Sequence, residues 1–102
     1  MAKERLYDDV MVDALREDPA FARAYLHQAF LDIDVEGGQE AFLLALRHIV
    51  EARGGMAAVA QKAGVSRESL YRTLSPTGNP TLKTLRSVVH AMGFQFSALA
   101  SA

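Results

Sequence analysis

The fold of this chain is decided by the stretch Met56-Ala-Ala-Val-Ala-Gln-Lys-Ala-Gly64-Val-Ser66-Arg-Glu-Ser-Leu-Tyr-Arg72-Thr-Leu74. This stretch predicts two short helices joined by a tight turn. Gly64 can adopt the left-handed backbone conformation that ends a helix, and Ser66 can cap the helix that follows. Ala60 is small enough to let the second helix pack closely against the first. We therefore expect a helix-turn-helix in this part of the chain.

The second helix of this unit carries the side-chain types that read base edges in the major groove of DNA. The candidates for base reading are Arg67, Glu68, Ser69 and Arg72. An arginine can donate two hydrogen bonds to the O6 and N7 atoms of guanine. The alternative interpretations of the arginines are a solvated side chain or a phosphate contact. For Glu68 we favour a local ion pair with Arg72, one helical turn later, over a contact with cytosine.

Phosphate contacts are expected around the same helix and the loop that follows it, because small polar groups and exposed backbone amides bind phosphate oxygens. The candidates are Ser66, Tyr71, Thr77, Asn79, Thr81 and Lys83. Ser66, Asn79 and Thr81 are also expected to cap the turn, the loop and the last helix, and both roles can hold together. Tyr71 is expected to be mainly structural. Its ring would lie in the core, or under the last helix with the hydroxyl reaching a phosphate.

The charge of the chain is distributed unevenly, although the net charge is only −1. Residues 1–46 contain four basic and ten acidic side chains, whereas residues 47–102 contain seven basic and two acidic ones. The basic half includes the predicted helix-turn-helix and can approach phosphates. The acidic half is expected to point away from DNA or to face a basic protein partner.

Apolar residues at helical spacing predict further helices over residues 8–17, 19–33, 39–53 and 81–92. Glycine pairs at 37–38 and 54–55 and a loop at 75–80 separate them. The expected fold is all-α with about six helices. The tail from Phe94 to Ser97 alternates apolar and polar residues, which predicts either a short strand paired with a second copy or a frayed end with Phe94 in the core. We divide the chain into an acidic helical segment (1–37), a DNA-binding domain (38–94) and a tail (95–102).

Residues 39–94 resemble the lambda-repressor/Cro-type helix-turn-helix family. The block Ser66-Arg-Glu-Ser-Leu-Tyr, the two glycine hinges, the loop Gly78-Asn-Pro-Thr and the pair Tyr25-Leu26 are similar to the addiction-module antidotes of bacterial toxin–antitoxin systems. The resemblance implies a homodimer that binds a palindromic operator and represses its own operon. It also implies a small toxin encoded by the adjacent gene, commonly an mRNA-cleaving ribonuclease, which the antidote neutralises.

Two other functions are consistent with the sequence: a stand-alone prophage-type transcriptional repressor without a toxin, and a protein-interaction module whose helix-turn-helix no longer binds DNA. An enzyme is not expected. The chain has no cysteine and therefore neither a disulfide nor a thiol nucleophile. His27, His48 and His90 lie on three different predicted helices, so we expect solvated histidines, no metal site and no cofactor. Neither a signal segment nor a membrane span is visible, and a cytoplasmic location is expected.

Overall fold

The computed structural model describes the backbone of residues 2–101 and the side chains of residues 6–101. Over this range it contains six α-helices, one short 3₁₀ helix and no strand, so the predicted all-α fold is confirmed. The helices are α1 (Ala2–Glu17), α2 (Pro19–Leu31), α3 (Gly38–Ala52), α4 (Met56–Ala63), α5 (Arg67–Thr73), α6 (Leu82–Ala91) and η1 (Phe96–Leu99).

The helix boundaries mostly follow the local sequence signals. Asp18 separates α1 from α2, and its carboxylate accepts hydrogen bonds from the backbone N–H groups of Ala20 and Phe21 at 3.0 and 3.2 Å. Two boundaries differ from the prediction by two residues or more, and the others agree to within one residue. Helix α1 begins at Ala2 instead of residue 8, because residues 2–7 contain no glycine or proline that would interrupt a helix before Asp8. Helix α2 ends at Leu31, two residues before the predicted end.

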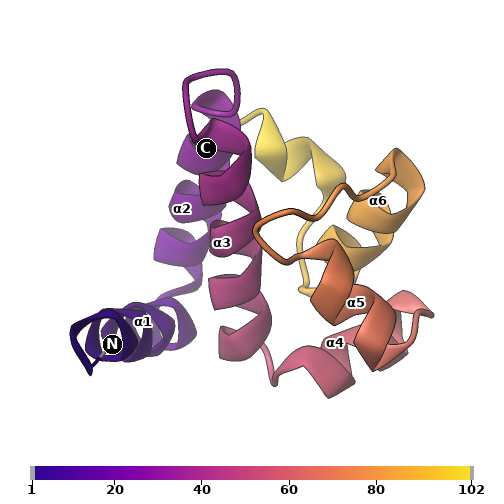
Figure 1. Cartoon of the computed structure of the whole chain (residues 1–102), viewed down its shortest axis with the longest axis horizontal. Helices are drawn as coiled ribbons and strands as arrows, with labels where there is room; N and C mark the ends of the chain where they lie inside the picture. The colour runs from indigo at the N-terminus through magenta and orange to yellow at the C-terminus, as the bar shows by residue number, and fades with distance from the viewer. Residues whose placement is uncertain (1, 102) are drawn as a thin grey trace.

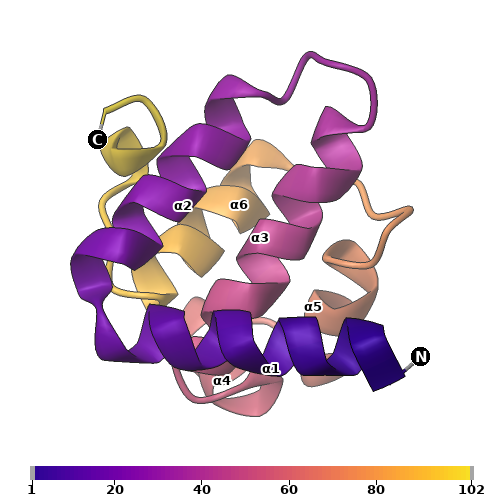
Figure 2. The same cartoon turned by 90° about the vertical axis from the view of Figure 1, so that its left-hand side faces the viewer.

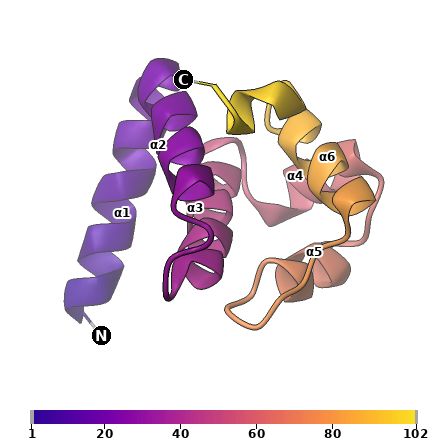
Figure 3. The ribbon, with the colours of Figure 1, turned by 90° about the horizontal axis from the view of Figure 1, so that it is seen from above.

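The six α-helices form two groups that are joined through α3 (Figure 3). Helices α1, α2 and α3 pack against one another, and α4 packs against both α5 and α6. Helix α1 crosses the ends of α2 and α3 (Figure 2), while η1 returns to lie against α2 and α6 (Figure 1). The acidic N-terminal helices are therefore packed directly onto the helix that leads into α4.

One hydrophobic core connects the two groups of helices. Its fully buried side chains come from every α-helix: Leu15, Leu26, Leu43, Leu46, Ile49, Val50, Val59, Leu70, Val88 and Val89. Burying an aliphatic side chain of this size contributes about 1.5–3 kcal/mol to the free energy of unfolding. Because the segments contribute to one core, the acidic helices and the predicted DNA-binding segment fold together.

Of the two alternatives for the C-terminal tail, the strand is wrong. Residues 96–99 form a 3₁₀ helix that buries Ala98 and Leu99, and the Leu99 carbonyl accepts a hydrogen bond from Nδ1 of His27 at 3.1 Å. Phe94 and Phe96 are both partly buried against the core. The alternative of a frayed end had placed Phe94 in the core, and this part of it agrees with the structure. The two rings pack against the core from an irregular segment and the start of a 3₁₀ helix, so the alternation did not indicate a strand here.

No helix within residues 2–101 combines the length and apolar composition needed to cross a lipid bilayer.

Candidate nucleic-acid interface

Helices α4 and α5 are joined by the tight turn that the sequence predicts. Gly64 has a φ of 74°, in the left-handed region, and the Val65 N–H bonds the Ala60 carbonyl at 3.1 Å. Ser66 then caps α5, because its Oγ accepts a hydrogen bond from the Ser69 N–H at 3.0 Å. Ala60 is buried beneath the turn. The predicted roles of Gly64 and of Ser66 are both confirmed.

Helix α5 buries one face and presents the other to solvent. Leu70 and Leu74 enter the core, whereas Arg67, Glu68 and Arg72 are exposed and Ser69 is half-buried. The four base-reading candidates thus lie on one short helix. The predicted ion pair between Glu68 and Arg72 is wrong, because no ion pair among the described side chains joins them. Both charges remain available to a ligand.

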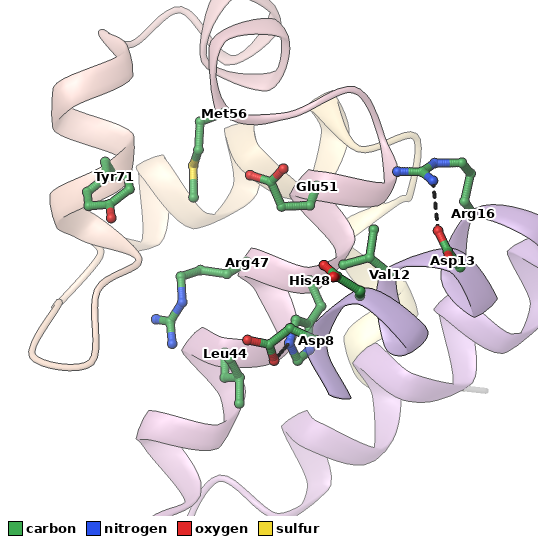
Figure 4. Close-up of a pocket in the computed structure, with 11 residues that line it drawn as sticks. Asp8, Val12, Asp13, Arg16, Leu44, Arg47, His48, Glu51, Met56 and Tyr71 are labelled. Atoms are coloured by element: carbon green, nitrogen blue, oxygen red, sulfur yellow. Dashed lines mark hydrogen bonds and ion pairs between the residues drawn. The ribbon is translucent and has the colours of Figure 1, made fainter. Parts of the chain in front are cut away.

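Tyr71 does not lie in the core or under α6, so its predicted structural role is wrong. Its side chain is 66% exposed. The apolar face of α5 is set by Leu70 and Leu74, four residues apart, and Tyr71 falls outside it. It instead projects toward Arg47 and Met56 (Figure 4), where its hydroxyl is open to a ligand.

The loop after α5 is held close to the end of that helix. The Gly78 N–H bonds the Ser75 carbonyl at 2.8 Å, and a Cβ atom at Gly78 would lie 1.9 Å from the Thr73 carbonyl oxygen. Only glycine fits this approach. The predicted cap of α6 is confirmed, because Oγ1 of Thr81 accepts a hydrogen bond from the Thr84 N–H at 3.1 Å. The remaining phosphate-binding candidates are exposed: Thr77 and Asn79 in the loop after α5, and Lys83 at the start of α6.

Arg47 is a structural residue that the sequence analysis missed. It lies on α3 and donates a hydrogen bond to the carbonyl of Leu74, at the C-terminal end of α5. Burial lowers the pKa of Arg47, and the nearby Asp8 carboxylate opposes this shift. A cation at this end of a helix complements the helix dipole. The signal in the sequence is an arginine bordered by buried residues of α3 on both sides.

His48 is buried in a hydrogen-bonded cluster, so its predicted surface position is wrong. Its Nε2 lies 2.8 Å from Oδ1 of Asp8 on α1, and its Nδ1 lies 2.8 Å from the Tyr25 hydroxyl on α2. A carboxylate only accepts hydrogen bonds, so Nε2 carries a proton and donates it to Asp8; in the neutral imidazole, Nδ1 then accepts from the Tyr25 hydroxyl. Burial raises the pKa of Tyr25 to about 12, with further contributions from Tyr7 and Asp8. This cluster ties the three N-terminal helices together.

The other two histidines differ from each other. His27 is half-buried through its bond to Leu99, so the predicted solvated position is wrong for it as well, whereas His90 is exposed as predicted. The spacing of residues in the sequence gave no signal that His27 would bond Leu99. Within the described residues, no three histidine, aspartate or glutamate side chains gather in a way that suits a metal ion.

A groove of about 630 Å³ runs between α1, α3 and the start of the α4–α5 segment (Figure 4). One wall carries four carboxylates together with Arg16 and Arg47, all from α1 and α3, and the other carries the side chains of Met56 and Tyr71. The lining carboxylates are Asp8, Asp9, Asp13 and Glu51. Asp8 is engaged by His48, and Asp13 forms an exposed ion pair with Arg16 at 3.1 Å. Carboxylates of α1 therefore line the same groove as Tyr71 of α5.

A family model described as probable addiction module antidote protein matches residues 6–100. The chain belongs to this family. An uncharacterized protein of Haemophilus influenzae is 48% identical over 61 residues, which cover 60% of this chain and 62% of that relative. No solved structure matches the chain. The match to the antidote family includes the acidic helices as well as α4–α6, so the predicted resemblance to addiction-module antidotes is confirmed.

Proposed function

We propose that this chain is a DNA-binding antitoxin. In this proposal it binds an operator of its own operon as a homodimer, represses that operon, and neutralises a small toxin encoded by the adjacent gene. Membership of the antidote family supports the neutralising role. The observation that carries the DNA-binding role is α5, an exposed helix after a tight turn, with two arginines free of ion pairs among the described side chains.

In the proposed complex, α5 enters the major groove of DNA with its N-terminal turn toward the bases. Arg67 and Ser69 then face base edges, and Arg72 follows along the groove. The loop at 75–80 and the start of α6 flank the phosphate backbone, where Thr77, Asn79 and Lys83 donate hydrogen bonds. The carboxylates that line the groove with Tyr71 repel phosphates. The DNA backbone therefore lies on the side of α5 that faces away from α1.

A homodimer would place two copies of α5 in successive major grooves. This geometry requires half-sites about 34–36 Å apart, one turn of DNA, or a multiple of that distance. The operator is therefore expected to be palindromic. A DNA operator also implies that the protein acts in the cytoplasm.

For the toxin we propose that the acidic wall of the groove beside α1 is the docking surface. Asp9, Asp13 and Glu51 suit a basic ribonuclease. Leu6 and Val10 lie one turn apart on α1 and are 65% and 61% exposed, which adds apolar contact area. A toxin side chain seated in the groove would also meet Tyr71. Toxin binding and DNA binding would then influence each other.

The antidote role is tested by co-expression in bacteria. Expression of the adjacent gene alone is expected to arrest growth, and co-expression of this chain is expected to restore it. Purification should recover the two proteins as one complex. If the neighbouring product neither arrests growth nor binds, the antidote role fails. A stand-alone repressor, which the same features of α5 support, would then be the remaining function.

A further inference from the structure

A second groove, of about 960 Å³, shares no lining residue with the groove beside α5. It lies between the N-terminal turns of α2, the end of α3 and the linker from α6 to η1. Its charged lining residues are Arg23 and Arg53, and no carboxylate lines it. The groove thus concentrates positive charge within a chain whose net charge is negative.

Arg53 is held in place but its charge is not compensated. Its guanidinium carbon lies 5.1 Å from the centroid of the Phe94 ring, a cation–π contact that orients the planar group. Its Nε is buried and has no hydrogen-bond partner. Among the described side chains, no carboxylate pairs with Arg53 or with Arg23. Because Nε is covered by protein, a ligand in the groove would meet the terminal N–H groups of Arg53.

The N-terminus of α2 does not account for an anion site by itself. Its N–H groups at Ala20 and Phe21 are already bonded by Asp18. The rest of the lining is mainly small and apolar, from Ala20, Ala24 and Ala98, with Gln95 as a neutral polar side chain. Such a surface suits the apolar body of a small organic molecule.

We propose that this groove binds a small organic oxyanion, a carboxylate or a phosphate ester. The guanidinium groups of Arg23 and Arg53 would hold the oxyanion, because their planar donors match carboxylate and phosphate oxygens. The apolar body of the ligand lies on the alanine side chains. A bound ligand bridges α2 and the linker before η1. The site is independent of α5, and its test uses no DNA and no toxin.

The experiment is an NMR titration of the full-length chain with benzoate, phenyl phosphate and benzamide. Benzamide has nearly the shape of benzoate but no charge. At least one of the two anions is expected to bind saturably and to shift the Arg53 Nε–H and the backbone amides of residues 93–98. Benzamide is expected to cause no saturable shift. Whichever anion binds more tightly identifies the preferred oxyanion.

Two variants localise the site. Arg23→Gln is expected to weaken binding of the preferred anion about tenfold, because one charge-assisted contact is lost. Arg86→Gln removes an exposed arginine of α6 that does not line the groove, and it should leave the affinity unchanged. Arg23 is exposed, so its substitution does not endanger the fold. Equal binding of benzoate and benzamide, absence of saturable shifts with both anions, or equal effects of the two variants would overturn the proposal.

Discussion

Arg47 and His48 are consecutive residues of α3, and each connects α3 to a different part of the molecule. Arg47 bonds the end of α5, and His48 bonds Asp8 on α1 and Tyr25 on α2. None of these three partners is near in sequence. A single-sequence analysis could identify the caps at Ser66 and Thr81, because a cap and its target lie three residues apart. It could not identify contacts that join α3 to residues far away in the sequence.

Tyr25 makes the fold sensitive to alkaline pH. Burial raises its pKa from 10 to about 12, so the folded chain holds the phenolic proton more tightly than the unfolded chain. The resulting stabilisation is complete below pH 10 and is lost as the pH rises from 10 toward 12. We expect the melting temperature of the wild type to fall over this range and that of Tyr25→Phe to fall less. Tyr71→Phe, at an exposed site, is the control and should show the same fall in melting temperature as the wild type. If the melting temperatures of all three proteins fall equally with pH, Tyr25 is not the cause of the alkaline sensitivity.

Arg67 and Lys83 are predicted to contribute to DNA binding in different ways. Arg67→Ala should relax the preference at one operator position by about 1–3 kcal/mol, because a base contact is lost. Lys83→Ala should weaken binding to all sequences alike. It should also reduce the slope of log affinity against log salt concentration by about 1, the contribution of one phosphate contact. Fluorescence anisotropy on the operator and on singly substituted operators separates the two effects. A uniform loss for both variants would mean that α5 does not read bases.

At the scale of elements, the segment from α4 to α6 follows its local signals closely. Glycine at the turn and hydroxyl caps at Ser66 and Thr81 mark the ends of these helices through hydrogen bonds between residues near in sequence. The tail is the opposite case. Alternation of two phenylalanines with polar residues is consistent with a strand, but the burial of Leu99 beside His27 selects a 3₁₀ helix. Short apolar patterns take their conformation from the surface that they cover.

The turn between α4 and α5 depends on the backbone conformation of Gly64. No atom outside its chain neighbours lies within 4 Å of a Cβ built there, so a substitution is opposed by the positive φ of 74° alone. Gly64→Val should reduce the free energy of unfolding by about 1–2 kcal/mol, because a left-handed conformation disfavours L residues. Gly64→Asn should cost less, since asparagine tolerates this region. Urea denaturation measures both, and equal losses would show that backbone strain is not the cause.

At the scale of the whole molecule, charge is segregated but the core is shared. Residues 1–46 and 47–102 carry opposite net charges, yet their helices bury a common set of aliphatic side chains. The segregation was visible in the sequence. The proximity of the α1 carboxylates to α5 was not, because it depends on how α1 crosses α3. This proximity is the physical basis for the proposed coupling between a toxin and the DNA-binding helix.

The acidic wall of the groove can be tested by neutralising its accessible carboxylates. The variant with Asp9→Asn, Asp13→Asn and Glu51→Gln should weaken toxin binding about tenfold, since exposed ion pairs are individually weak but act together here. A matched control changes three exposed acids outside the groove: Asp34→Asn, Glu36→Gln and Glu40→Gln. Calorimetric titration with the toxin compares them. If the control weakens binding as much as the groove variant, the toxin recognises overall charge and not this surface.

The central claim, that α5 recognises a specific DNA sequence, is tested most directly by a gel shift. The purified chain is mixed with the DNA upstream of its own gene in the presence of excess unrelated DNA. The double variant Arg67→Ala, Arg72→Ala serves as the comparison. The proposal predicts a discrete complex with the wild-type chain that resists the competitor and disappears with the double variant. Absence of a specific complex, or equal binding by the double variant, would contradict it.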